Sequence, residues 1–476
     1  MNRTPKQVLS AVLAMAMIDV KQRKKQSEQI SMGGTAMKKL GKTVALILSS
    51  LMAVTAFYGC ESKSVGSGTS SVQKAMVNIY QFQVETNDEV VATAKNYMKE
   101  NPNVTVTVQT VGGSSDYGSS LRAKMASGDQ PEIIQLSGPS DLVEWKDSLE
   151  DLSDQSWVKD LLPSVKDDST LNGKTVAFPY STLDYGIIYN KQMFADAGID
   201  MNGVDTFEKI DAAFGKLKQK IDSGAMKNKY PSLEAVMAFP AKESWVSGNH
   251  SSNIALAPEL GTAMKALNAK TINFTYASEL KDYIDLMVKY TKYAKNPSAL
   301  NAVDYSTALD QGFATERDAA IQMGQWVVPE INKIDPTLGE NLGLLPIPLK
   351  GVQEGNIVAG VGGLWVINKN SSSVNKSAAK KFLQWWWCTK DGQKEYKGDI
   401  ILSGLKNPPV EPNNVISIAG EKYIASGKVT PVVFTGYPSG WPDKLSQGIQ
   451  SYLSGTKTWG QVIQQAKDDW AKLRSN

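Results

Sequence analysis

The sequence is poor in the residues that bind metals and form disulfides. It has only two cysteines, Cys60 and Cys388, and one histidine, His250, among 476 residues. A structural disulfide is therefore not expected, and zinc sites of the HExxH type or with paired histidines are excluded. No GxxxxGK[ST] phosphate loop occurs, and no cofactor is expected. Stability must come from buried apolar area.

The chain also lacks a basic excess once its first segment is set aside. Residues 1–59 carry nine of the 51 basic and two of the 48 acidic residues, which leaves 42 basic and 46 acidic residues, a net charge of −4. This balance, without basic runs, argues against nucleic acid as a partner. The remaining 417 or so residues are too many for one core and predict two lobes.

Residues 37–60 have the pattern of an export signal. Three lysines precede an uncharged apolar run at residues 43–57, which is too short to span a membrane. The run ends at Gly-Cys and resembles a bacterial lipobox, in which Cys60 is acylated and becomes the first residue. We therefore expect residues 37–59 to be a lipoprotein signal peptide and residues 60–74 a flexible tether. An ordinary signal that contains a cysteine is the alternative.

Residues 1–36 precede this signal, although signals begin at the N-terminus. We expect them to be a mis-assigned extension, with translation starting at Met37. Glycine codons at positions 33 and 34 can spell a purine-rich ribosome-binding run. A long basic n-region is the alternative.

Alternating strand and helix patterns predict an α/β fold with a mainly parallel sheet. Asn172-Gly173 predicts a two-residue hairpin turn, and Thr206 is typical of a helix N-cap. Strands are expected at residues 75–80, 104–111, 132–136, 175–179, 319–323, 344–349 and 358–367. Helices are expected at residues 88–99, 119–125, 206–221, 377–387 and 461–473.

Four segments, in this order, resemble the extracellular solute-binding proteins of ABC importers, in the carbohydrate-binding family that includes maltodextrin-binding protein. The first is the strand at residues 131–134. The second and most specific runs from Gly173-Lys-Thr through Tyr189-Asn-Lys to Ala197-Gly198 and a helix start at residues 205–208. The third, residues 313–326, ends in Gly-Gln-Trp, and the fourth is Gly362-Gly363 before an apolar strand.

The resemblance implies a periplasmic-binding-protein-like α/β fold, with two lobes that close on a ligand about a hinge. It places lobe one at residues 75–180 plus 359–407 and lobe two at residues 181–358 plus 408–476. The hinge strands then lie near residues 179–184 and 356–360. It further implies a monomeric receptor, lipid-anchored on the extracytoplasmic face of a bacterial cell membrane, that delivers a carbohydrate, expected to be an oligosaccharide, to an ABC permease.

Sugar binding needs flat rings for C–H faces and fixed polar groups for hydroxyls. Trp326 follows a predicted strand where an open α/β sheet binds ligands, and the resemblance gives it a stacking role. Core packing is its alternative. The other candidates for ligand contact lie in loops at strand ends or beside the hinge: Gln83, Glu85, Tyr117, Ser137, Gly138, Tyr180, Asp184, Tyr185, Lys242, Trp245, Gln325, Gly363 and Trp441.

Several of these residues have a structural alternative. We expect one of Tyr180 and Tyr185 to contact ligand and the other to pack. The three tryptophans at residues 385–387 point about 100° apart on a helix, so two should pack and one should lie near the surface. His250 is expected to be a loop residue.

Two rival functions stay open. A protein of the same fold that binds a peptide, polyamine or metal chelate would have a cleft dominated by charges. An exported glycan-active enzyme would need two carboxylates about 5–10 Å apart, which the sequence cannot show. We expect neither catalytic residues nor metal ligands.

Overall fold

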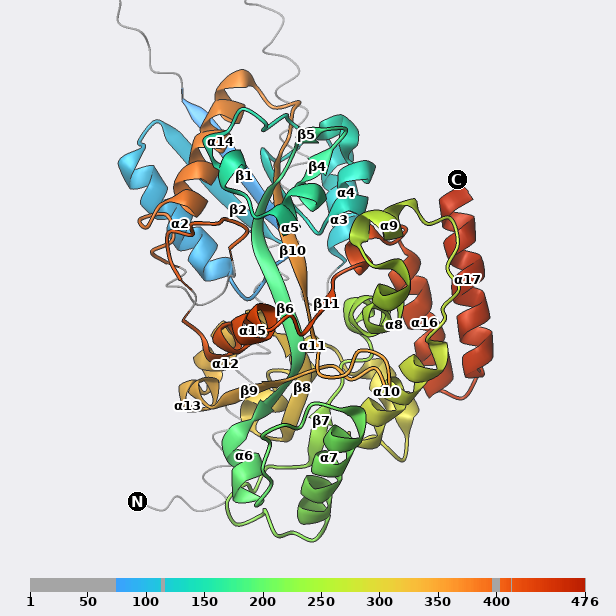
Figure 1. Cartoon of the computed structure of the whole chain (residues 1–476). Helices are drawn as coiled ribbons and strands as arrows, with labels where there is room; N and C mark the ends of the chain where they lie inside the picture. Colours follow the sequence, from blue (N-terminus) through green and yellow to red (C-terminus); the bar gives the residue numbers. More distant parts are fainter. Residues whose placement is uncertain (1–73, 113–115, 396–402, 412, 476) are drawn as a thin grey trace, which may run out of the picture. The chain divides into compact units, whose positions relative to one another are not determined.

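The computed structural model describes residues 74–112, 116–395, 403–411 and 413–475. The predicted signal peptide, Cys60 and the tether up to residue 73 lie outside these residues. In the described part, one sheet has the spatial order β2-β1-β3-β10-β6-β8-β7, with β11 beside β10 and β9 beside β6 (Figure 1). Its strands are β1 (Ala75–Gln81), β2 (Val104–Thr110), β3 (Ile133–Leu136), β6 (Phe178–Asn190), β7 (Ala235–Ala238), β8 (Asp318–Gly324), β9 (Leu342–Leu345), β10 (Ile357–Ile367) and β11 (Val429–Pro431).

The first hydrophobic core surrounds the parallel strands β1, β2 and β3. Its largest fully buried side chains include Trp365, Trp386 and Tyr180. Two further strands form a separate hairpin, β4 (Thr170–Leu171) and β5 (Lys174–Thr175). The helices on this side are α2 (Asn87–Glu100), α3 (Tyr117–Ala126), α4 (Pro139–Glu144), α5 (Pro163–Lys166) and α14 (Ser373–Cys388).

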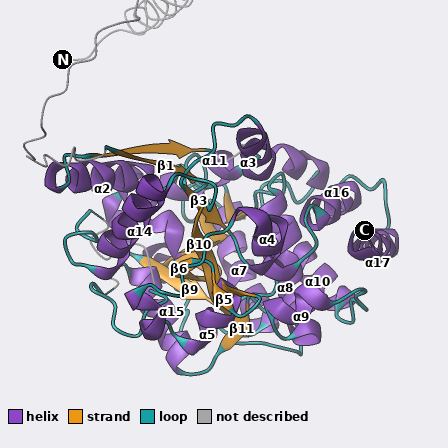
Figure 2. Cartoon of the chain, turned by 90° about the horizontal axis from the view of Figure 1, so that it is seen from above, coloured by secondary structure: helices purple, strands orange, loops and turns teal. Residues whose placement is uncertain are grey.

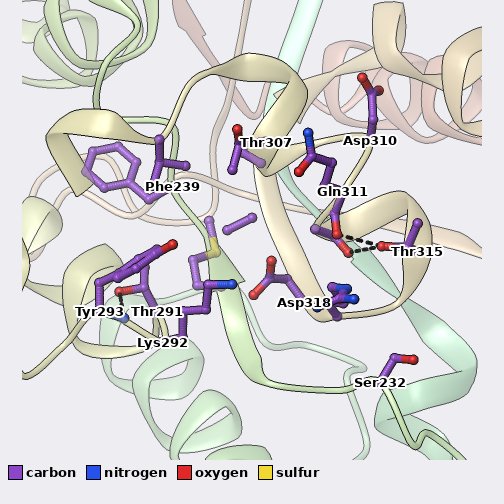
Figure 3. A pocket seen from close by; sticks show the side chains of 16 residues that line it. Ser232, Phe239, Thr291, Lys292, Tyr293, Thr307, Asp310, Gln311, Thr315 and Asp318 are labelled. Carbon is purple, nitrogen blue, oxygen red and sulfur yellow. Dashed lines mark hydrogen bonds between the residues drawn. The ribbon is translucent and has the colours of Figure 1, made fainter. Parts of the chain in front are cut away.

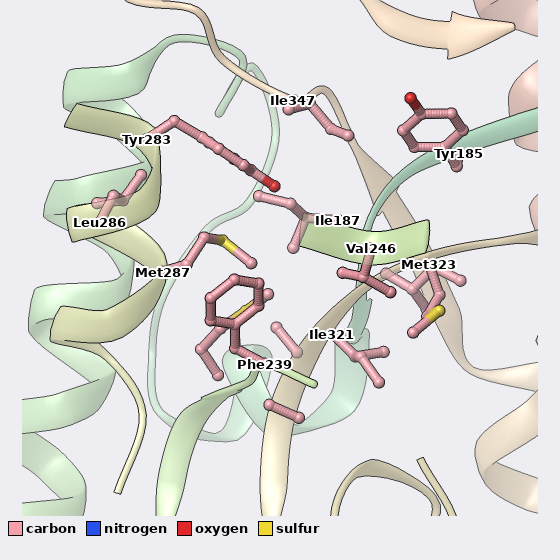
Figure 4. Packing of buried hydrophobic residues seen from close by; sticks show 14 of the residues in the cluster. Tyr185, Ile187, Phe239, Val246, Tyr283, Leu286, Met287, Ile321, Met323 and Ile347 are labelled. Atoms are coloured by element: carbon pink, nitrogen blue, oxygen red, sulfur yellow. The ribbon is translucent and has the colours of Figure 1, made fainter. Parts of the chain in front are cut away.

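The second core packs helices around β7, β8 and β9. Figure 4 shows Tyr283 and Met287 of one helix facing Phe239, Ile187 and the sheet residues beside them. The helices here are α6 (Lys191–Asp196), α7 (Phe207–Asp222), α8 (Ser251–Leu260), α9 (Ala263–Asn268), α10 (Ala277–Lys289), α11 (Tyr305–Ala308), α12 (Val328–Ile334), α13 (Pro336–Glu340), α15 (Val415–Ala425), α16 (Trp441–Leu453) and α17 (Trp459–Ser475). Seen from above, helices lie on both sides of the central strands (Figure 2).

Two long strands connect the cores. β6 contributes Tyr180 to the first core and Tyr185 to the second, and β10 runs antiparallel to it. Their pairing shifts register between Val361 and Leu364. Gly363 is needed in this stretch, because a Cβ there would overlap the ring of Tyr180. We propose that the lobes follow the two cores, with the boundaries and hinge strands expected from the sequence.

Most predicted elements are confirmed, but the sheet is mixed rather than mainly parallel, because β6 and β10 pair antiparallel with each other and with β3, β8 and β9. The strand predicted at residues 175–179 is interrupted between β5 and β6. Asn172 and Gly173 form the turn between β4 and β5 with φ values of 52° and 76°, as a two-residue hairpin requires. Thr206 caps α7 by accepting a hydrogen bond from the Lys209 amide at 3.3 Å. The extended segment predicted at residues 344–349 is a strand only up to Leu345. In α14, Trp386 and Trp387 are buried and Trp385 is half-buried, as predicted.

Candidate functional site between the two cores

Five ring side chains of the second core gather around His250, and we call these six residues the aromatic cluster. The imidazole of His250 stacks on Tyr185 with 4.1 Å between ring centroids, and the rings of Trp245 and Trp326 lie 5.2 and 5.6 Å from it. The full cluster is Tyr185, Trp245, His250, Tyr305, Trp326 and Phe434. Trp245, Trp326 and Phe434 are half-buried, so the cluster keeps accessible ring surface above a buried floor.

Local backbone geometry holds these rings in place. Trp245 and His250 are the two ends of η5 (Trp245–His250), a π-helical turn of a kind frequent at functional sites. Trp326 lies in η8 (Gln325–Val327), directly after the carboxyl end of β8. Gly324 is required at that point, because a Cβ there would overlap the Trp326 indole.

His250 is a neutral hydrogen-bonding group in this environment. Burial lowers the pKa of its imidazole to about 3. The Nδ1 atom lies 3.2 Å from the amide nitrogen of Gln322, which is a donor, so Nδ1 accepts and Nε2 carries the proton. The cluster therefore contains an N–H donor whose charge does not change near neutral pH.

A group of carboxylates adjoins the cluster, and we call Glu85, Asp310 and Glu330 the acid group. The hydroxyl of Tyr305 donates to Glu330 at 2.9 Å, and the Tyr305 ring lies 5.8 Å from Trp245. Burial raises the pKa of Glu330 to about 7, and Asp310 adds to the shift. Burial also raises the pKa of Glu85, which follows β1, while the Tyr305 hydroxyl opposes the shift. The acid group thus joins a residue of the first core's loops to the aromatic cluster.

The first core contributes Gln83 from the loop after β1 and Tyr117 from the start of α3. Gln83 accepts hydrogen bonds from the Tyr180 hydroxyl at 2.7 Å and from the Gln135 amide at 3.1 Å. Tyr117 donates to the Gln135 carbonyl at 2.8 Å, and its ring lies 5.3 Å from that of Phe82. These contacts fix both side chains relative to the first core.

A second contact region between the cores involves α4 and η9 (Phe434–Gly436). Gly138 approaches Thr435 so closely that a Cβ would overlap the threonine side chain. The Ser140 hydroxyl donates to the Tyr437 carbonyl at 2.8 Å. The backbone amide of the predicted site residue Ser137 donates to the Asp141 carboxylate of its own turn at 2.7 Å. Gly138 therefore lies where the two cores meet.

Three predicted residues are engaged elsewhere. Gln325 accepts from the Asp184 amide at 3.0 Å and donates to the Thr182 carbonyl at 3.2 Å, so both ends of its amide hold β6. The Asp184 carboxylate is buried against Gly420 of α15, and burial raises its pKa well above the ordinary value. Lys242 pairs with Asp304 at 3.4 Å.

Tyr180 and Trp441 pack inside the cores. Tyr180 lies among the tryptophans of the first core, 5.2 Å from Trp365, and Gly363 packs against its ring. Trp441 is fully buried, 5.0 Å from the ring of Trp470, and its N–H donates to the Ala466 carbonyl at 2.7 Å. Its ring has no exposed face on which a sugar could stack, which corrects that expectation.

Sequence reasoning missed His250, Tyr305, Phe434 and Glu330. His250 is not a surface loop residue, because η5 turns it into the second core. Tyr305 begins the short helix α11 and Phe434 begins η9, and neither has a periodic pattern around it. For His250, Tyr305 and Phe434, residue type was the only available signal, since all three are rings in a chain that the resemblance already linked to sugar binding.

Two negative findings apply to the described residues. No cluster of three or more His, Cys, Asp or Glu side chains there is arranged to hold a metal ion. No helix in that part of the chain is both long enough and apolar enough to cross a membrane.

Comparison with known families identifies the chain. Residues 92–403 match the family model described as bacterial extracellular solute-binding protein. The chain belongs to this family. The multiple sugar-binding protein of Streptococcus mutans is 24% identical over 375 residues, which cover 75% of this chain and 83% of that protein. The melibiose/raffinose/stachyose-binding protein MelE of Bacillus subtilis is 22% identical, over 91% of this chain and 96% of that protein.

A solved structure supports the same fold. A sugar transporter from Bacillus licheniformis, in complex with stachyose, superposes with a TM-score of 0.63 at 20% identity, over 84% of this chain and 100% of that chain. This solute-binding protein therefore has the two-lobed α/β fold that the sequence predicted. Members of the family are the binding components of transporters rather than enzymes.

Proposed function

We propose that this solute-binding protein captures an oligosaccharide between its lobes and delivers it to an ABC permease. The aromatic cluster carries the proposal, because Trp245, Trp326 and Phe434 keep accessible ring surface around His250. Tyr305 of the same cluster bonds to Glu330 and interacts with Glu85, which is expected in lobe one. Such rings suit the C–H faces of sugars. Relatives whose names record melibiose, raffinose, stachyose and other sugars support the same ligand class.

Hydroxyl recognition is assigned to the polar groups around the rings. The acid group offers acceptors, and the Nε2–H of neutral His250 offers a donor. Gln83, Glu85 and Tyr117 are the lobe-one contacts that we retain from the sequence prediction. A buried hydroxyl or carboxylate left unmatched costs about 1–3 kcal/mol, so this pattern selects among sugars.

Delivery of the ligand to the permease depends on closure of the two lobes and on the location of the protein at the membrane. Ligand favours the closed lobes because it contacts both, so binding shifts the population toward the form that docks on the permease. Family membership implies an extracytoplasmic, membrane-associated protein. Anchoring through acylated Cys60, a monomeric state and the absence of catalysis are parts of the proposal.

A ligand panel tests the proposal. Thermal shift and calorimetry would compare raffinose, stachyose and chitin oligosaccharides with a tripeptide and putrescine. We expect at least one oligosaccharide to bind and to raise the melting temperature, with Trp326→Ala weakening it. Trp385→Ala, a half-buried tryptophan of α14 in the first core, is the matched control and should bind normally. Binding of only the peptide or putrescine would contradict a sugar receptor, and turnover of a bound glycan would favour an enzyme.

A further inference from the structure

A cavity of about 510 Å³ lies in lobe two (Figure 3). None of its lining residues belongs to the aromatic cluster, and Asp310 is the one member of the acid group among them. It is bounded by the edge strand β7, by residues 291–293 after α10, and by α11 with the turn that follows it. The segment that begins with α11 contributes to both the aromatic cluster and the cavity. Tyr305 at the start of α11 belongs to the cluster, and Gln311 and Gly312 line the cavity.

The carboxylate of Asp318 faces this cavity (Figure 3). Only 9% of the residue is exposed, and within the described part of the chain its carboxylate accepts no hydrogen bond and forms no ion pair within 4 Å. Burial raises its pKa to about 7. Gly312 makes room for it, because a Cβ there would lie 2.6 Å from the Asp318 Oδ2 atom. The carboxylate oxygens face the cavity and no group of the described residues donates to them, so a ligand with donor groups can bind them there.

Two cationic side chains line the cavity, and both form ion pairs with Glu234. Lys292 and Arg317 bind the two oxygens of Glu234 at 2.9 and 2.7 Å. Their charges act on Asp318 from a distance and lower its pKa, against the larger effect of burial. Glu234 and Asp310 are acidic residues beside the same cavity, so its wall holds charges of both signs. A neutral hydroxyl donor can bind the Asp318 carboxylate without requiring either sign to dominate.

We propose that this cavity is a second binding site, for a neutral polyol the size of a monosaccharide. Two adjacent hydroxyls donate to the Asp318 carboxylate, and the half-buried ring of Tyr293 covers a C–H face. The exposed amide of Gln311 bonds to a further hydroxyl. The cavity volume falls within the range of about 300–1,000 Å³ for small-molecule sites. This site goes beyond the proposed function, because it lies within one lobe and its occupancy does not require closure.

The experiment measures polyol binding when the aromatic cluster is impaired. Saturation-transfer NMR and calorimetry would test glucose and myo-inositol against the purified Trp326→Ala protein, where we expect binding to persist. Adding Asp318→Asn should weaken it at least tenfold. The matched control is Asp222→Asn, which changes an exposed carboxylate that pairs with Lys218 at 2.8 Å, and it should leave polyol binding unchanged.

A second variant protects the test against a folding defect. Tyr293→Ala removes the ring from the cavity wall and should also weaken polyol binding, with melting curves checking that each variant is folded. Absence of polyol binding to Trp326→Ala would overturn the proposal, as would equal binding by the Asp318→Asn protein. Tighter binding of putrescine than of either polyol would also overturn it, because the cavity would then be a cation site.

Discussion

Two regions of this protein are rich in the same residue types and use them differently. In the first core, Trp365, Trp386 and Trp387 are buried, with ring centroids 4.7 to 5.2 Å apart. In the aromatic cluster, Trp245 and Trp326 keep part of their surface accessible and lie beside the neutral imidazole of His250. Residue type alone therefore does not separate a stabilising tryptophan from one available to a ligand.

The difference comes from what surrounds each ring. The helix α14 presents Trp386 and Trp387 to other apolar side chains, so nearly all of their area is removed from water and contributes to stability. Trp245 lies on a π-helical turn and Trp326 on the turn after β8, and only part of each ring packs against the second core. Substitutions in the two regions should consequently separate stability from binding.

The largest effect is expected for Trp386→Ala. The side chain is fully buried against Trp365, Phe382 and Trp387, so truncation leaves a large cavity. We expect a loss of about 3–5 kcal/mol in the free energy of unfolding. Urea denaturation would measure it, with Trp386→Phe as the milder control. A loss below about 1 kcal/mol would mean that this region does not depend on packing.

Trp326→Ala should give the opposite result. The half-buried ring contributes less to the core, so we expect a small change in melting temperature. Loss of a stacking face should weaken oligosaccharide binding by about tenfold to a hundredfold, or roughly 1.4–2.8 kcal/mol. Calorimetry at fixed pH would measure the dissociation constant. Unchanged affinity with reduced stability would make Trp326 a core residue like Trp386.

The sequence predicts the parts of this contrast that depend on residues close together in the chain. The strand and helix patterns, the Asn172-Gly173 turn and the tryptophan pair that packs in α14 all follow from local periodicity and turn chemistry. Trp326 could be singled out because it directly follows a buried strand.

The rest of the site depends on packing between distant segments. His250 meets Trp326 only because η5 bends it into the second core, and Tyr305 meets Glu85 only when segments 220 residues apart come together. Gln325 and Trp441 have the right residue types, but their polar atoms are satisfied by Asp184, Thr182 and Ala466, which no local pattern reveals.

The comparison extends to carboxylates, where Asp318 is a buried acid without a partner in the described residues. Its pKa of about 7, against 3.8 ordinarily, means that the protonated form is favoured on folding. That stabilisation is complete below about pH 4 and is lost as the pH rises through 7. Asp318→Asn should therefore be more stable than the parent protein at pH 8, by about 1–2 kcal/mol, and similar at pH 4.

Thermal unfolding at the two pH values would measure this difference. Asp222→Asn, at the exposed C-terminal end of α7, is the control and should show no pH-dependent gain. A lower melting temperature for Asp318→Asn at pH 8 would mean that the charged carboxylate is stabilised by a group in the protein, and the cavity would lose its unmatched acceptor.

The smallest effect is expected at the acid group, where carboxylates from both lobes approach Tyr305. Burial and Asp310 raise the pKa of Glu330 to about 7, and burial also raises the pKa of Glu85. The conformation that brings these carboxyl groups together therefore binds more protons than one in which they are apart. Protonation stabilises that conformation fully below the ordinary carboxyl pKa, and this stabilisation is lost as the pH rises through about 7.

If lobe closure brings the groups together, oligosaccharide affinity should fall by about two- to fivefold from pH 5 to pH 8. Calorimetry across this range would show the slope, and Glu330→Gln should flatten it while the Asp222→Asn control keeps it. A slope that survives Glu330→Gln would place the proton uptake at another residue and would leave the aromatic rings as the main contact that distinguishes the binding region from the packed core.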